Sequence, residues 1–100
     1  MPTVLVVDDE PQILKLLAHM LRKEYSVITA ESGIEALVLY ESYSDRIDLV
    51  ITDITLPGMS GLELVARLEA LYRHRVAAIL ITGVQLSRRE RRFPNPFRLP

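Results

Sequence analysis

Three aspartates and a threonine in this sequence stand directly after short apolar runs rich in β-branched residues. Asp8 and Asp9 follow the first run, Asp53 follows the third, and Thr82 follows the fourth. Clustered carboxylates repel one another, and a hard cation such as Mg²⁺, which prefers oxygen ligands, would relieve that repulsion. A carboxylate can also act as a nucleophile and become an aspartyl-phosphate. We therefore predict a magnesium-assisted phosphoryl site in which Asp53 is the nucleophile and Thr82 donates a hydrogen bond to a phosphoryl oxygen.

The apolar runs themselves indicate how these side chains would be brought together. We expect strands at residues 3–7, 25–30, 48–52 and 76–81, and helices at residues 13–21, 34–40 and after 60. Strands that alternate with helices in this order predict an α/β fold with a parallel sheet covered on both faces. The carboxyl ends of parallel strands meet at one edge of the sheet, where ligands bind in such folds.

The expected helices carry start signals and apolar stripes. Residues 32–35 and 60–63 both have the spacing of a capping box, in which a serine caps the helix and a glutamate follows three positions later. For the first helix we expect an apolar face made by Ile13, Leu16, Leu17, Met20 and Leu21. For the third helix we expect a face made by Leu62, Val65, Leu68 and Leu71.

Each candidate residue taken alone also has a plain structural interpretation. Asp9 or Glu10 would cap the helix that begins near Pro11. Asp53 alone fits the chemistry of a turn, and Thr82 alone is an ordinary residue at the end of a strand. The argument for a site therefore depends on the convergence of all four residues at one edge of the sheet.

The composition excludes several classes of protein. One hundred residues, 49% hydrophobic and 25% charged, suit one small globular domain. The chain has no cysteine, so neither disulfides nor thiolate chemistry is available. No apolar run approaches the roughly 20 residues that cross a bilayer, and the first residues lack the pattern of a secretory signal. We expect a cytoplasmic protein without a membrane partner.

The last residues depart from this pattern. Residues 1–87 carry 7 Lys/Arg against 12 Asp/Glu, a balance of −5, whereas residues 88–100 carry five arginines against Glu90 alone, a balance of +4. Pro94, Pro96 and Pro100 exclude a long helix there. We divide the chain into a core domain, residues 1–87, and a basic, proline-rich tail, residues 88–100. We interpret the tail as a solvated linker and do not expect direct nucleic-acid binding.

The sequence resembles the receiver domains of bacterial two-component response regulators. The likeness rests on residues 4–11, 48–53, 56–63 and 79–83, which together have that family's spacing. The resemblance implies a doubly wound, flavodoxin-like sheet of order 2-1-3-4-5. It also implies that Asp53 is the phosphoacceptor, and that Asp8, Asp9, Asp53 and the backbone carbonyl of Thr55 bind Mg²⁺. Thr82 corresponds to the hydroxyl that moves toward the phosphoryl group and signals its arrival.

The end of the chain differs from the family pattern. The family has a lysine that contacts the phosphoryl oxygens and precedes a proline, and Asn95 stands nearest to that position. Asparagine donates a hydrogen bond but carries no charge, and charge-assisted hydrogen bonds are about twice as strong. The stretch between Thr82 and Asn95 is short, so we expect a shortened fourth helix, and a shortened fifth strand within the tail at residues 88–100. Only three residues follow Phe97, so we expect no fifth helix.

We weigh three functions against these observations, of which the first two fit. The first is a phosphoacceptor that takes its phosphoryl group from a sensor histidine kinase or phosphotransfer protein and switches an output surface toward an unknown effector. It would be no enzyme beyond its own self-catalysed phosphorylation and dephosphorylation. The second is a pseudo-receiver that only binds proteins. The third, an aspartyl-phosphatase-type enzyme, lacks the second acid that such enzymes carry two positions after their nucleophile, since position 55 is threonine. We also expect the sheet edge at residues 76–81 to favour a homodimer.

Overall fold

Four parallel strands form the sheet in the computed structural model, which describes residues 1–43 and 45–82. The strands are β1 (Thr3–Val7), β2 (Ser26–Ala30), β3 (Ile47–Asp53) and β4 (Ala78–Ile81). Their order across the sheet is β2-β1-β3-β4, which confirms the predicted doubly wound topology for these strands. The expected fifth strand, the shortened fourth helix, the missing fifth helix, Asn95 and the boundary at residue 88 all lie outside the described residues.

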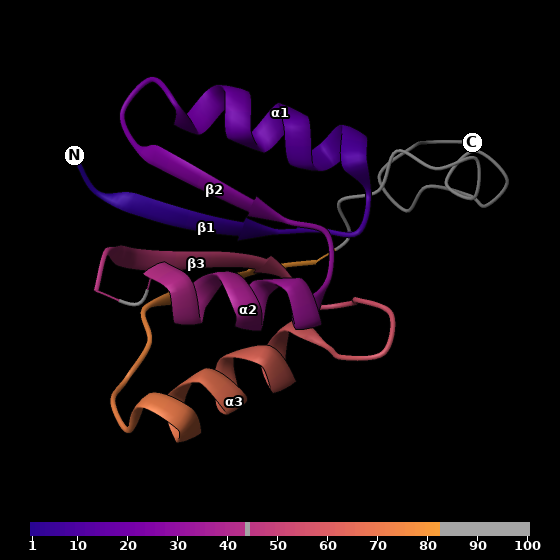
Figure 1. Cartoon of the computed structure of the whole chain (residues 1–100). Helices are drawn as coiled ribbons and strands as arrows, with labels where there is room; N and C mark the ends of the chain where they lie inside the picture. The colour runs from indigo at the N-terminus through magenta and orange to yellow at the C-terminus, as the bar shows by residue number, and fades with distance from the viewer. Residues whose placement is uncertain (44, 83–100) are drawn as a thin grey trace, which may run out of the picture.

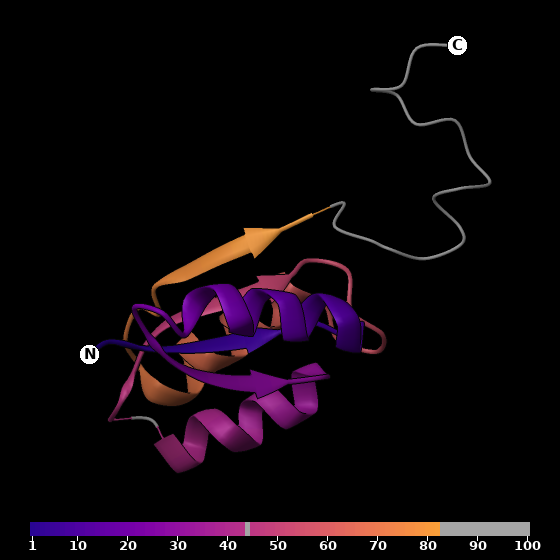
Figure 2. The same ribbon diagram turned by 90° about the horizontal axis from the view of Figure 1, so that it is seen from above.

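Three helices connect the strands and cover the two faces of the sheet. They are α1 (Pro11–Leu21), α2 (Gly33–Tyr43) and α3 (Gly61–Tyr72). α1 lies on one face, and α2 and α3 lie side by side on the other (Figures 1 and 2). This arrangement follows from right-handed crossovers between parallel strands, because the chain reverses its direction of travel across the sheet after β2. No helix among the described residues is both long enough and apolar enough to span a bilayer.

Both predicted capping boxes start a helix. The backbone N–H of Glu35 donates to Ser32 Oγ, and that of Glu63 donates to Ser60 Oγ, each at 3.0 Å. Each serine thereby satisfies one of the amide groups that the first helical turn leaves without a partner. The starts of α2 and α3 are fixed by these local signals.

The strand registers bring the ends of β1, β3 and β4 to the same level. Val7 pairs with Thr52, and Asp53 pairs with Ile81. Asp8 and Asp53 therefore leave neighbouring strands side by side, and the next strand delivers Thr82 beside them. All the strands end at this edge of the sheet, which we call the carboxyl edge (Figure 1).

The main hydrophobic core lies between the sheet and the pair α2 and α3. It contains the fully buried side chains of Leu5, Val50, Leu64 and Leu68. Burial of a leucine or valine side chain contributes about 1.5–3 kcal/mol each. A smaller cluster on the α1 face contains Val4, Val6, Leu14 and Ile51.

The predicted apolar stripes of two helices were partly wrong. On α1, Leu16 and Met20 are 51% and 59% exposed, whereas Leu14 and Ala18 are buried. On α3, Leu62 and Leu71 are also exposed, and the buried residues are Gly61, Leu64 and Leu68. Both helices have apolar residues on more than one side, and several sets satisfy helical spacing. Only packing against the sheet selects between these sets.

Candidate functional site

Three acidic side chains meet at the carboxyl edge. Asp8 and Asp9 come from the end of β1, and Asp53 is the last residue of β3. One carboxylate oxygen from each lies within 4.8 Å of the others. Asp8 and Asp53 are buried, with 2% and 7% of their surface exposed, whereas Asp9 is exposed. The site therefore has two acids in its floor and one at its rim.

The surroundings of Asp8 disfavour the charged form of its carboxyl group. Its carboxylate accepts a hydrogen bond from the backbone N–H of Glu10 at 2.9 Å, which favours the charged form. Burial outweighs this hydrogen bond and raises the pKa of Asp8, and repulsion from Asp53, Asp9 and Glu10 raises it further. Among residues 1–43 and 45–82, no lysine or arginine forms an ion pair with any of the three aspartates. The pocket therefore carries unbalanced negative charge.

The carboxylate of Asp53 is held by the loop that follows β3. Its Oδ1 accepts a hydrogen bond from the backbone N–H of Thr55 at 3.0 Å. The loop then returns to the core, where the side chains of Leu56 and Met59 are buried. The main chain of Thr55 is thus adjacent to the Asp53 carboxylate, while the Thr55 side chain is exposed.

The backbone around Asp53 is anchored from three directions. The N–H of Ile54 donates to the carbonyl of Ile81 in β4 at 2.9 Å, and the carbonyl of Ile54 accepts from the N–H of Gly61 at 2.8 Å. The buried hydroxyl of Thr52 donates to the carbonyl oxygen of Asp53 at 3.0 Å. Sequence reasoning missed Thr52 and Gly61. A polar residue inside an apolar strand and a glycine at the first position of a helix were the available signals.

Of the two remaining candidate residues, Thr82 and Asn95, only Thr82 lies within the described residues. Thr82 directly follows Ile81, the partner of Asp53 in the sheet, and its side chain is exposed at the carboxyl edge. Asn95 lies outside the described residues. Thr82, the predicted switch residue, therefore comes directly after β4, the strand that pairs with the end of β3 at Asp53.

The start of α1 does not support the alternative interpretation that an acidic side chain caps this helix. The N-cap residue of α1 is Glu10, and its side chain makes no capping hydrogen bond. Pro11 occupies the first helical turn, where its missing N–H costs nothing. Asp8 and Asp9 are therefore not employed as caps of this helix.

The donor set suits a hard divalent cation. Carboxylate oxygens are the protein ligands that Mg²⁺ prefers, and opposite ligands in its octahedron are about 4.2 Å apart. Adjacent ligands in the same octahedron are about 2.9 Å apart. One oxygen from each of Asp8, Asp9 and Asp53 lies within 4.8 Å of the others, so the three carboxylates would have to move closer together to bind one Mg²⁺ ion.

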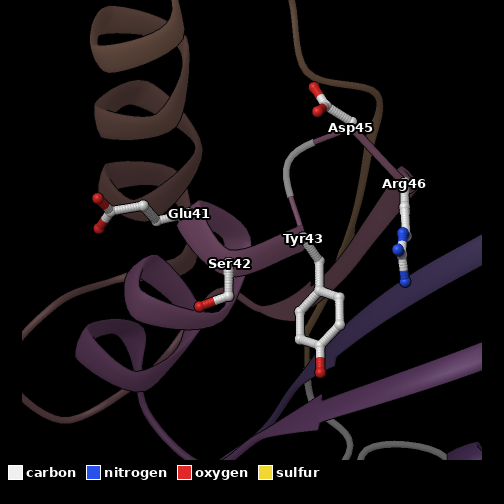
Figure 3. Close-up of a pocket in the computed structure, with 5 residues that line it drawn as sticks. All are labelled: Glu41, Ser42, Tyr43, Asp45 and Arg46. Carbon is white, nitrogen blue, oxygen red and sulfur yellow. The ribbon is translucent and has the colours of Figure 1, made fainter.

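A cavity of about 420 Å³ lies far from these acids, at the end of α2. Five side chains line it and point in different directions (Figure 3): Glu41, Ser42, Tyr43, Asp45 and Arg46. It sits where β3 begins, at the opposite edge of the sheet from Asp53. It offers no convergent set of chemical groups.

Comparison with known proteins agrees with the geometry of the carboxyl edge. Residues 4–91 match the family described as "Response regulator receiver domain". The chain is 45% identical over 67 residues to the transcriptional regulatory protein GlrR of Escherichia coli; the match covers 66% of this chain but 15% of that protein.

Two solved structures are similar to most of this chain. A receiver domain protein from Clostridium thermocellum has a TM-score of 0.78 and 33% identity, covering 83% of this chain and 66% of that one. The response regulator TrrA of Thermotoga maritima, solved in complex with Mg²⁺ and BeF, has a TM-score of 0.72 and 42% identity, covering 84% of this chain and 71% of that one.

Proposed function

Because the chain belongs to the family of response regulator receiver domains, we propose that it accepts a phosphoryl group on Asp53. The observation that carries this proposal is the approach of three carboxylates from β1 and β3 to within 4.8 Å of one another. Burial and repulsion between like charges make such a cluster energetically costly, and groups of this kind are common at functional sites. A cation bound beside the carboxylate of Asp53 would offset the repulsion.

The proposed transfer needs few groups from the protein. A carboxylate oxygen of Asp53 attacks the phosphorus of a phosphohistidine on a sensor kinase or phosphotransfer protein. The new O–P bond forms as the P–N bond breaks, and the imidazole keeps the electron pair and takes up a proton. The hydrogen bond from Thr55 N–H orients the carboxylate for this in-line attack. No other covalent step is required.

Mg²⁺ is the proposed cofactor, held by Asp8, Asp9, Asp53 and the backbone carbonyl of Thr55. When bound, it supplies charge neutralisation for the phosphoryl oxygens. Asp8 and Asp9 hold it from the β1 side, and the loop after Asp53 holds it from the β3 side. TrrA in complex with Mg²⁺ and BeF, a relative with the same fold, supports this assignment.

Thr82 is the proposed sensor of the phosphoryl group. A phosphoryl group on Asp53 adds charge beside β4, and the exposed Thr82 hydroxyl is free to rotate and donate to it. Ligand-driven switching of this kind shifts an existing equilibrium between conformations. The match covers 15% of the length of GlrR, and the effector that would respond to this switch is unknown.

Phosphorylation by a small donor tests the function directly. Acetyl phosphate and Mg²⁺ should add one phosphoryl group to the wild-type protein, detected by intact-protein mass spectrometry, and none to Asp53→Asn. Asp48→Asn is the matched control, because Asp48 lies on the same strand but is exposed. Equal labelling of all three proteins would place the modification elsewhere. Failure of the wild type to label would favour the alternative, a phosphorylation-independent module for protein binding.

A further inference from the structure

The main-chain carbonyl of Asp53 is packed unusually tightly for a group next to a reactive side chain. Its oxygen accepts the hydroxyl proton of Thr52, whose side chain is fully buried. Gly61, the first residue of α3, also lies against this carbonyl. A Cβ atom at position 61 would stand 2.3 Å from the Asp53 oxygen and 3.1 Å from the carbonyl carbon.

That contact leaves no room for any side chain at position 61. An obstruction made of backbone cannot swing aside, so a methyl group there would push α3 and the end of β3 apart. Gly33, the first residue of α2, provides a comparison. A Cβ at position 33 would meet the side chain of Met59, with the sulfur at 2.9 Å and the Cβ at 3.1 Å. The sulfur can move by changing rotamer, whereas the Cβ contact needs a small shift of the Met59 backbone.

The orientation of this carbonyl is linked to that of the Asp53 carboxylate through the loop that follows, because Thr55 N–H holds the carboxylate. Rotating the carbonyl changes the ψ angle of Asp53, and with it the path of Ile54 and Thr55. The N–H of Thr55 donates to the Asp53 carboxylate, and the carbonyl of Ile54 accepts from Gly61. A displaced carbonyl would therefore move both the nucleophile and the amide that orients it.

We infer that Gly61 and the Thr52 hydroxyl are positioning residues that fix the Asp53 carbonyl and so aim its carboxylate. The inference rests on the proposed function of Asp53. Neither residue touches the phosphoryl group; both act through the main chain. The packing of α3 against β3 is thereby part of the reactive site.

Gly61→Ala compared with Gly33→Ala tests this role. Both variants add one methyl group to the first residue of a helix. Gly61→Ala should slow phosphorylation by acetyl phosphate at saturating Mg²⁺ and donor by about 10²-fold, the usual effect of misplacing a reacting group by about 1 Å. Gly33→Ala should slow phosphorylation much less, because its added methyl group meets the Met59 side chain and not the Asp53 carbonyl. Equal rates in Gly61→Ala and wild type, at the same fraction folded, would overturn the inference.

Substitutions of Thr52 keep the inference testable if Gly61→Ala does not fold. Thr52→Val removes the hydroxyl at nearly constant volume and should slow phosphorylation about tenfold, the scale of one hydrogen bond. Thr52→Ser keeps the hydroxyl and should retain the wild-type rate. A Thr52→Val rate equal to that of Thr52→Ser would exclude the hydroxyl as a positioning group.

The resting protein offers a readout that does not depend on phosphorylation. The ¹H–¹⁵N signal of Thr55 reports its hydrogen bond to Asp53, and it should shift in Gly61→Ala and Thr52→Val but not in Gly33→Ala. An unchanged Thr55 signal in the first two variants would contradict the positioning role. If the wild type never labels yet these shifts occur, the positioning stands and the phosphoacceptor function fails. If the wild type labels and the variants match it, the positioning fails alone.

Discussion

The two faces of the sheet are covered to very different degrees within the described residues. On the α2 and α3 face, Val50, Leu64 and Leu68 are completely buried. On the α1 face, Val4 and Val6 are equally well buried, but Ile79 of β4, the sheet partner of Ile51, is 50% exposed. The first face is a closed core, whereas the second has apolar surface that α1 does not cover.

The carboxyl edge of the sheet is supported by the well-packed face that α2 and α3 cover. Leu56 and Met59, from the loop after Asp53, are both buried in the core under α2 and α3. Gly61 of α3 contacts the carbonyl of Asp53. The position of Asp53, the proposed nucleophile, is therefore determined by a well-packed region, which resists displacement better than a half-covered one.

Truncation of the closed core should have the largest effect on stability. Leu68→Ala should lower the free energy of unfolding by about 3 kcal/mol, because it leaves a cavity between α3 and the sheet. Leu71→Ala, one turn later on the same helix, should change it by less than about 0.5 kcal/mol, since Leu71 is 67% exposed. Urea denaturation measures both. Similar losses in the two variants would mean that the faces of α3 are assigned wrongly.

Removal of the α3 cap should have a smaller effect on the same face. Ser60→Ala should cost about 1 kcal/mol, because the N–H of Glu63 loses its acceptor. Ser42→Ala is the control: its hydroxyl donates to a carbonyl within α2 and caps nothing. Thermal unfolding of both variants would show whether α3 depends on its cap. A larger loss in Ser42→Ala would contradict this view.

The pH dependence of stability should report the repulsion at Asp8. Its raised pKa means that the folded state holds the proton more tightly than the unfolded chain does. Asp8 therefore makes the protein less stable as pH rises from the ordinary pKa of the carboxyl through the raised folded value. Without Mg²⁺, Asp8→Asn should be more stable than wild type at neutral pH, because it removes the buried charge and its repulsion from Asp53 and Asp9. The difference should disappear at acidic pH.

Added Mg²⁺ separates repulsion from general instability. Mg²⁺ should raise the unfolding midpoint of the wild type more than that of Asp8→Asn, because binding to the folded state stabilises it by mass action. Equal stabilisation of both proteins would argue against Asp8 as a ligand. Denaturant titrations at several pH values, with and without Mg²⁺, measure both effects.

Polar substitution on the open face should have the smallest effect. Leu16→Gln should change the free energy of unfolding by less than about 0.5 kcal/mol, because the side chain is half exposed. Leu14→Ala on the same helix should cost about 2 kcal/mol or more, since Leu14 is buried against β1. A large loss in Leu16→Gln would show that this face is covered in solution.

Much of the fold could be predicted because its signals are local. Apolar β-branched runs mark the strands, and Ser32 and Ser60 mark two helix starts by hydrogen bonds that span three residues. The alternation of strands and helices then restricts the sheet to few topologies. The convergence of Asp8, Asp9 and Asp53 follows from that topology alone, because all three end parallel strands.

The buried faces of the helices could not be predicted in the same way. Leu14 and Leu16 are chemically alike, and either satisfies helical spacing. The choice depends on where α1 lies over the sheet, which is a property of packing between distant segments. The same limit applies to Gly61, whose contact with Asp53 joins residues that are eight positions apart.

The sequence by itself determined the strand and helix order and the helix caps, because periodicity and capping act through neighbouring residues. It also indicated the meeting of three acids, because parallel strands end at one edge of a sheet. Tertiary structure alone decided which side chains are buried, how strongly burial raises the pKa of Asp8, and that α3 contacts the carbonyl of Asp53. Burial and close approach depend on surfaces that meet only after the chain has folded.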